Sequence, residues 1–139
     1  MEIIANALQT VPANQNVYFT DTVTCGNCAI THRDDSGLVT LRGMTGQCRA
    51  RFRVSFGANI AVPTGGTVGP ISLAIAIDGE AIRSTTMTVT PTVVDAFFNV
   101  FSSVFIDVPR GCCVTISVKN ITDVDVDVQN ANLIVDRVA

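Results

Sequence analysis

Hydrophobic and polar residues alternate along most of the chain, in runs separated by Gly, Pro, Asn and Asp. A period of two places successive side chains on opposite faces of a β-strand, whereas a surface helix repeats near every 3.6 residues. We count about ten such runs at spacings of roughly 8 to 14 residues, a pattern typical of all-β sandwiches and barrels. The pattern predicts an all-β protein of two sheets and about ten strands, forming a single domain over residues 1–139.

The clearest alternation lies between Cys48 and Phe56. One face of this predicted strand carries Ala50, Phe52, Val54 and Phe56, and the other carries Arg49, Arg51 and Arg53. The apolar face predicts contact with a hydrophobic core. The arginine face has two interpretations: an ordinary solvated strand face, or an interface stripe that pairs with carboxylates of another subunit or of a capsid shell.

Other runs predict further strands and one tight turn. Strands are predicted at Val17–Thr20, Ala29–His32, Leu38–Leu41, Ile71–Ile77, Phe97–Val108, Cys112–Val118 and Leu133–Val135. Asp78-Gly79 predicts a two-residue hairpin, because both central positions of a type I′ turn need positive φ. Residues 1–12 fit either the first strand or an N-terminal arm that anchors the chain to a neighbour.

Composition narrows the class of protein. The chain has 139 residues, 47% hydrophobic and 15% charged, which excludes a disordered segment. No run approaches the roughly 18 apolar residues of a membrane helix, so we expect no membrane partner. A net charge of −3 disfavours nucleic acid as a partner. The N-terminal residues lack the basic and apolar regions of a signal peptide, which predicts synthesis in the cytoplasm.

Two groups of residues are weak candidates for a metal site. Cys25 and Cys28 have the spacing of half a zinc site or of a redox pair, although zinc would need two further ligands, and a disulfide in this turn is an alternative. Asp123, Asp125 and Asp127 resemble the start of a calcium loop, but the Gly and Glu that complete such a loop are missing. Alternation with valines favours a strand whose aspartates face water. We therefore predict no metal and no cofactor.

The two adjacent cysteines of the chain should face opposite sides of one strand. Cys112 is predicted to point to the core, and Cys113, in phase with Thr115 and Ser117, to point outward. Packing alone is the simpler interpretation of both thiols. A catalytic triad, a phosphate-binding loop and a dinucleotide fingerprint are all absent from the sequence, so we predict that the protein is not an enzyme.

Four stretches together resemble a known family of jelly rolls. They are 43–56, Ile71–Arg83 around Asp78-Gly79, Val108–Ile116, and the terminal Asn130-Ala131-Asn132-Leu133-Ile134-Val135-Asp136-Arg137. Their order is similar to that of the tumour necrosis factor and complement globular heads. It is closest to the C-terminal heads of collagen-like exosporium glycoproteins and to free-standing heads among phage structural proteins. No Gly-X-Y stalk precedes the head, which favours a free-standing head.

The resemblance implies a ten-stranded jelly roll assembled as a compact homotrimer. It implies that one sheet, holding the strands Cys48–Phe56, Cys112–Val118 and Leu133–Arg137, presents its outer face to neighbouring subunits. The predicted interface residues are Arg49, Arg51, Arg53, Cys113, Thr115 and Ser117. On this basis the arginine stripe is more simply explained as an interface than as a solvated face.

The expected function is structural. The resemblance implies a trimeric capsid decoration or head-fibre protein on the surface of a phage virion, with a capsid protein as its partner. One alternative is a head that binds a host receptor or glycan through the loops Asn59–Gly69 and Thr90–Asp95. The other is a surface head of the spore exosporium.

Overall fold

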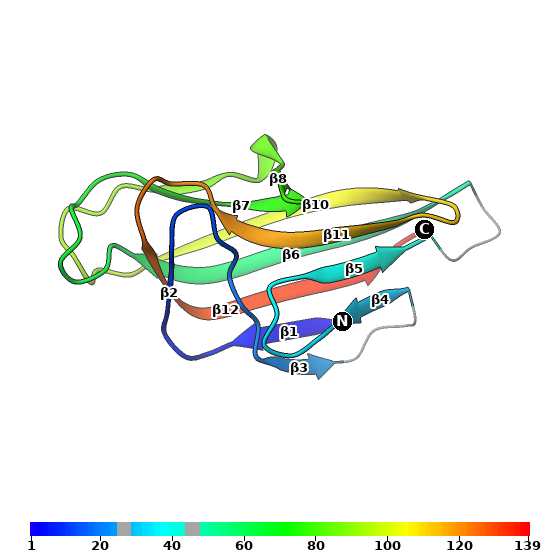
Figure 1. Ribbon diagram of the computed structural model, residues 1–139, viewed down its shortest axis with the longest axis horizontal. Coiled ribbons are helices and arrows are strands. Elements are labelled where there is room, and N and C mark those ends of the chain that lie inside the picture. Colours follow the sequence, from blue (N-terminus) through cyan, green and yellow to red (C-terminus); the bar gives the residue numbers. More distant parts are fainter. Residues whose placement is uncertain (25–28, 44–47) are drawn as a thin grey trace.

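The computed structural model describes residues 1–24, 29–43 and 48–139, which form a sandwich of two six-stranded sheets (Figure 1). Sheet A has the order β10 (Phe98–Pro109), β6 (Arg49–Ala61), β12 (Val126–Arg137), β1 (Glu2–Ala5) and β3 (Asp21–Thr24), with β2 (Gln9–Val11) paired to β12. Sheet B has the order β4 (Ile30–His32), β5 (Val39–Arg42), β11 (Cys113–Asn120), β7 (Ile71–Ile77) and β8 (Glu80–Ala81), with β9 (Met87–Val89) paired to β7. The predicted all-β, two-sheet architecture is confirmed. The described residues contain twelve strands rather than ten, because several are only two to four residues long.

Helix is almost absent from the described residues. A single 3₁₀ turn, η1 (Arg83–Thr85), follows β8, and no helix in this part of the chain is long and apolar enough to cross a membrane.

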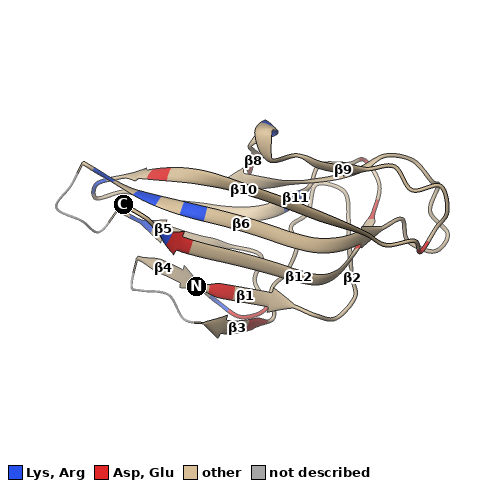
Figure 2. Ribbon diagram, turned by 180° about the vertical axis from the view of Figure 1, so that it is seen from behind, with Lys and Arg blue, Asp and Glu red and all other residues tan. Residues whose placement is uncertain are grey.

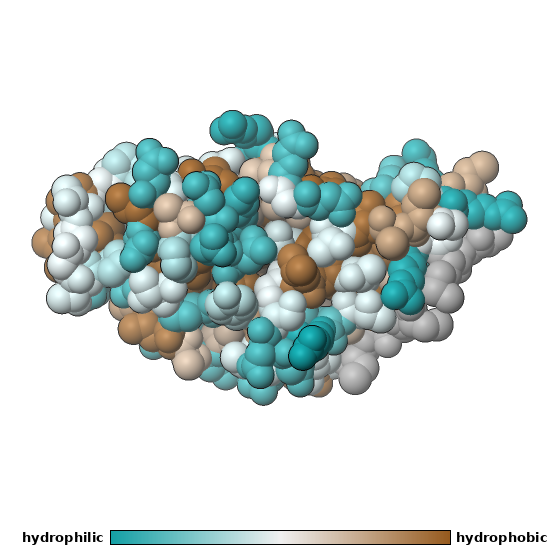
Figure 3. All heavy atoms as spheres, in the orientation of Figure 1, coloured by the Kyte–Doolittle hydropathy of each residue, from teal (hydrophilic) through white to brown (hydrophobic). Residues whose placement is uncertain are grey.

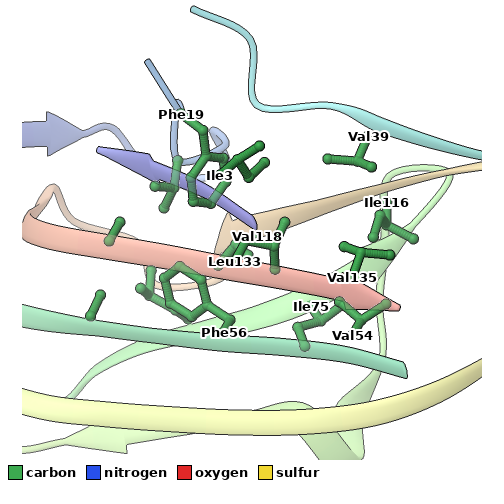
Figure 4. Close-up of a cluster of buried hydrophobic side chains, with 14 of the residues drawn as sticks. Ile3, Phe19, Val39, Val54, Phe56, Ile75, Ile116, Val118, Leu133 and Val135 are labelled. Carbon is green, nitrogen blue, oxygen red and sulfur yellow. The ribbon is translucent and has the colours of Figure 1, made fainter. Parts of the chain in front are cut away.

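The core fills the space between the two sheets. On β6 every second side chain, from Ala50 through Phe52, Val54 and Phe56, is fully buried, as the alternation predicts. Figure 4 shows Phe56 and Leu133 of sheet A facing Ile75 and Val118 of sheet B. The Phe56 ring meets that of Phe19 edge to face, with the ring centroids 6.3 Å apart.

The hairpin between β7 and β8 confirms the turn predicted at Asp78-Gly79. Both residues have positive φ, 51° and 87°, and Ile77 pairs with Glu80 across the turn. The Asp78 carboxylate accepts a hydrogen bond from the Thr115 backbone at 2.9 Å, which ties the turn to β11.

The N-terminal residues are part of sheet A. β1 pairs with β12 on one side and with β3 on the other, and β2 pairs with the start of β12. Of the two interpretations of residues 1–12, the structure therefore supports strands of the sheet rather than a separate arm.

The segment between β2 and β3 crosses from one sheet to the other. Val17 donates a backbone hydrogen bond to Val118 of β11, and Thr20 donates one to Ile4 of β1. The strand predicted at Val17–Thr20 is wrong in detail, because this segment makes only isolated bridges. Its alternation is nevertheless real, since Val17 and Phe19 are fully buried while Tyr18 between them is exposed.

Candidate interaction surface

The outer face of sheet A carries the arginine stripe. The register places Arg49, Arg51 and Arg53 of β6 opposite Pro109, Asp107 and Phe105 of β10. On the other side of β6, Arg53 lies opposite Asp136 of β12. The three arginines therefore lie between two strands that each supply a carboxylate.

Those carboxylates pair with the arginines within one chain. Arg51 contacts Asp107 through two hydrogen bonds of 2.8 and 3.1 Å, and Arg49 lies 3.4 Å from the same carboxylate. Arg53 lies 3.4 Å from Asp136. We define these five residues as the charged half of the face. Neighbouring strands of sheet A therefore already supply carboxylates to the arginines, and pairing with another subunit or a capsid shell stays a prediction.

The same contacts alter ionisation at this surface. The hydrogen bond from Arg51, helped by the positive charges of Arg51 and Arg49, lowers the pKa of Asp107, while partial desolvation opposes the shift. The Asp107 carboxylate likewise raises the pKa of Arg51. Both groups are solvent-exposed, so the pair is screened and contributes little to stability.

The rest of this face is uncharged and partly apolar. Phe101 and Phe105 of β10 are 65% and 62% exposed, and Ile134 of β12 is 36% exposed. We call these three residues the apolar half. Gly57 lies opposite Phe101, and a Cβ atom added there would lie 3.7 Å from the Phe101 ring, so the ring lies over bare backbone.

Figure 2 shows this face directly. Two blue bands on β6 lie beside a red band on β10 and another on β12, all close to the C-terminus of the chain, and most of the remaining length of these three strands is tan. Polar side chains in the uncharged part bond to one another, as Ser55 does to Ser103 at 2.9 Å and Asn99 to Asn59 at 3.2 Å. Such a face offers a partner two aromatic rings and few unpaired polar groups.

The other predicted interface residues lie elsewhere. Cys113, Thr115 and Ser117 belong to β11, which is in sheet B and not in the sheet that holds the arginines. The prediction that one sheet holds all of these strands is wrong, because β11 pairs with β5 and β7. Ser117 is also only 3% exposed. The six residues therefore do not form one surface.

The predicted orientation of Cys112 is wrong as well. Cys112 lies in the turn after Gly111, whose φ is 76°, and both it and Cys113 are exposed. Strand β11 begins only at Cys113, so the alternation that would turn Cys112 inward has not yet started.

The weak metal candidates are not brought together. Asp123 and Asp125 lie exposed before β12, but Asp127 is 5% exposed because β2 pairs alongside it. The Thr10 hydroxyl donates to its carboxylate at 2.7 Å, so the prediction that Asp127 faces water is wrong. Within residues 1–24, 29–43 and 48–139, no three His, Cys, Asp or Glu side chains form a metal-binding group. Cys25 and Cys28 lie outside the described residues.

The loops predicted for receptor binding meet at one end of the sandwich. Strand β6 extends to Ala61, so the first loop begins later than Asn59. Thr64 donates to the Asp95 carboxylate at 2.5 Å, and the Asp95 amide donates to Val62 at 2.9 Å, which joins the two loops. A hollow of about 310 Å³ lies between the first loop and residues 124–125. Exposed valines surround this end: Val68, Val93, Val94 and Val124.

His32, the single histidine, has a structural position. Its Nε2 donates to the Ser36 carbonyl at 2.9 Å, and its side chain is fully buried beside Phe19. Such a histidine holds the turn after β4 in place.

Comparison with known proteins identifies the fold. No family model and no curated protein sequence matches the chain. Among solved structures, the globular domain of zebrafish complement 1qA protein superposes with a TM-score of 0.63 at 12% identity, covering 96% of this chain and 93% of that one. The chain has the complement-head jelly-roll fold. The resemblance predicted from the sequence is thus confirmed at the level of fold.

Two carbohydrate-binding modules align more loosely. The family 35 module of Cellvibrio japonicus Abf62 gives a TM-score of 0.40 at 7% identity, covering 100% of this chain and 98% of that one. The family 35 module from Clostridium thermocellum gives 0.36 at 10% identity, covering 91% and 97%. Neither TM-score is high enough to support a conclusion about this chain.

Sequence reasoning missed the aromatic residues of this surface. Phe97–Val108 was predicted as one apolar strand without assigning its faces. A signal was available, since Asn99, Ser103 and Asp107 mark the outward phase that Phe101 and Phe105 share.

Proposed function

We propose that this complement-head jelly roll is a non-catalytic structural protein that forms a homotrimer and decorates a phage capsid. The observation that carries the proposal is the apolar half of sheet A, where Phe101 and Phe105 are more than 60% exposed. Burying such rings against another copy would contribute free energy in proportion to the apolar area removed from water. Three joined copies would dock with the avidity of three weak contacts.

The charged half would orient the subunits. Its arginines and carboxylates are already paired, so covering them would not leave isolated buried charges, which are costly. Paired charges at the rim of an interface contribute to specificity more than to affinity. This supports self-association through the whole outer face of sheet A, with the apolar half supplying most of the free energy.

The capsid setting rests on the resemblance to free-standing phage heads. A structural role requires no catalytic cluster. The apolar half can pack against a partner, and the charged half already pairs its charges within the chain. The proposed site of action is the virion surface, after synthesis in the host cytoplasm.

Self-association is tested by native mass spectrometry. The wild-type chain is expected at three times the chain mass, and the double variant Phe101→Asp/Phe105→Asp is expected as a monomer. Val93→Asp, at an exposed valine in the distant loop 90–95, serves as the matched control and should retain the wild-type mass. A monomeric wild-type chain, or a double variant with unchanged mass, would contradict the proposal.

Replacing Arg49, Arg51 and Arg53 together by Ala tests the charged half. Because these residues already have partners within the chain, we expect a weaker trimer rather than a complete loss. Unchanged assembly in this triple variant would remove the charged half from the interface.

Docking is tested with phage capsids produced without this chain. The added wild-type protein should co-sediment with the capsids in multiples of three, whereas the monomeric double variant should bind far less. Failure of trimeric protein to co-sediment would contradict the decoration role while leaving the trimer intact.

The joined loops at 62–70 and 90–97 favour a second candidate function. Their exposed valines and the hollow of about 310 Å³ support a head that binds a host receptor, on a virion or on a spore. In that case Val93→Asp would reduce attachment to host cells without changing the oligomeric mass.

A further inference from the structure

Tyr18 stands exposed at the crossing segment between the two sheets. It is the only tyrosine of the chain, and its side chain is 56% exposed. A hollow of about 410 Å³ lies on one side of it and another of about 260 Å³ on the other. Tyr18 and Asp35 line both hollows and so form the ridge between them.

The backbone around this ridge is held firmly. The Gln9 side chain accepts from the Tyr18 amide at 3.0 Å and donates to the Tyr18 carbonyl at 2.9 Å. On either side of Tyr18, the buried side chains of Val17 and Phe19 anchor the segment in the core. The backbone that carries the ring is therefore ordered before a ligand arrives, so binding does not have to order it.

The segment that carries Asp35, the other residue of the ridge, is also held in place by hydrogen bonds. The Asp35 amide donates to the Phe19 carbonyl at 2.9 Å, and the Phe19 amide donates to the Ser36 carbonyl at 3.2 Å. Gly37 allows the close approach of the two segments, because an added Cβ atom would lie only 2.6 Å from the Val17 carbonyl oxygen. The hollows are therefore built into the fold.

The two hollows differ in chemistry. The larger one is lined by amide and charged side chains, including Gln15, Asn16, Arg33 and Asp34, which together offer both donors and acceptors. The smaller one is mainly apolar and is lined by Ala5, Ala7 and Leu8. A ligand that spans the ridge meets an aromatic face and hydrogen-bonding groups on one side and an aliphatic wall on the other.

We propose that this ridge binds a neutral sugar. A pyranose ring has an apolar face of C–H groups that can lie on the Tyr18 ring, and a rim of hydroxyl groups that can bond to the amides and carboxylates. Asp34 and Asp35 outnumber the single Arg33, which disfavours a phosphate or carboxylate ligand. Figure 3 shows one whole face of the molecule, in the orientation of Figure 1, on which teal and white residues predominate and brown ones lie between them.

This site is independent of the proposed assembly. It lies on the crossing segment and the turn after β4, and it shares no residue with the apolar or charged half of sheet A. A monomeric variant would therefore bind sugar as well as the wild type does.

The test is a titration of ¹⁵N-labelled protein, followed by amide chemical shifts, with four neutral probes. These are the methyl glycosides of glucose, galactose, mannose and N-acetylglucosamine. At least one should give saturable shifts at the amides of Asn16, Tyr18, Ser36 and Gly37. If none does at concentrations up to tens of millimolar, the proposal is overturned.

Variants assign the binding to the ring. Tyr18→Ala should weaken binding about tenfold, because the stacked apolar contact is lost, whereas Tyr18→Phe should stay within about threefold of wild type. Val23→Ala is the matched control, since Val23 is equally exposed at 56% but lies outside both hollows. Unchanged binding by Tyr18→Ala would overturn the proposal.

A negatively charged sugar tests the inference that the ligand is neutral. Methyl glucuronide, which carries a carboxylate on a pyranose ring, should bind at least about tenfold more weakly than the neutral glycoside that binds, since Asp34 and Asp35 repel it. Tighter binding of the glucuronide would overturn the assignment of a neutral ligand.

Discussion

Phe56 and Phe101 lie on the paired strands β6 and β10, yet they have opposite environments. Phe56 is fully buried between the sheets, while Phe101 on the outer face is 65% exposed. The two positions differ only in strand phase, because Phe56 pairs with Ser102 and Phe101 pairs with Gly57. The same residue type thus supports folding on one face of sheet A and is left for a partner on the other.

The largest expected effect is at the inner face. Phe56→Ala should lower the free energy of unfolding by about 3–5 kcal/mol, because a ring is removed from a fully packed site and a cavity remains. Urea unfolding of the isolated variant measures this. A loss below about 1 kcal/mol would mean that the space between the sheets is loosely packed, which would weaken the contrast with Phe101.

A polar residue inside the sandwich should behave like a core residue. Asn120 is fully buried, and its amide nitrogen lies 3.0 Å from the Val11 carbonyl and 2.9 Å from the Val124 carbonyl, while its oxygen accepts from Thr122 at 2.9 Å. Asn120→Ala should destabilise the chain by about 2 kcal/mol, because buried carbonyls lose their donor. The same urea experiment measures it, and Asn99→Ala at the exposed face is a matched control that should have little effect.

The outer phenylalanines should matter little for the stability of one chain. Phe101→Ala and Phe105→Ala, measured at concentrations where the protein is monomeric, should each change the free energy of unfolding by about 0.5 kcal/mol or less. A loss as large as that of Phe56→Ala would show that these rings pack within the subunit, and would remove the basis for the proposed interface.

The smallest effect is the pH dependence of the Arg51–Asp107 pair. The folded-state pKa of Asp107 is lowered, so its contribution to stability is present above the unfolded pKa of about 4 and is lost as the pH falls through the folded value. The melting temperature of Asp107→Asn should therefore lie slightly below that of wild type at pH 7. The difference should shrink at pH 3, and a difference that grows on acidification would contradict this sign.

Much of the fold could be predicted from the sequence because local patterns encode it. The alternation on β6 identified its buried face, since charged arginines cannot share the core with Phe52 and Phe56. On β10 the signal is weaker, because Asn99, Ser103 and Asp107 mark the outward face but Phe101 and Phe105 share it. The ion pairs of the charged half could not be predicted, because Asp107 and Asp136 lie on strands distant in sequence from the arginines.

The sequence by itself determined the all-β architecture, the inward face of β6 and the turn at Asp78-Gly79, because strand period and turn chemistry act over a few residues. Only the tertiary structure decided which strands share a sheet, since backbone pairing joins segments far apart in the chain. That pairing placed β11 in sheet B, covered Asp127 with β2 and brought carboxylates to the arginine stripe. The long-range pairings also established that Phe101 and Phe105 lie exposed on the outer face of sheet A, and they formed the ridge at Tyr18.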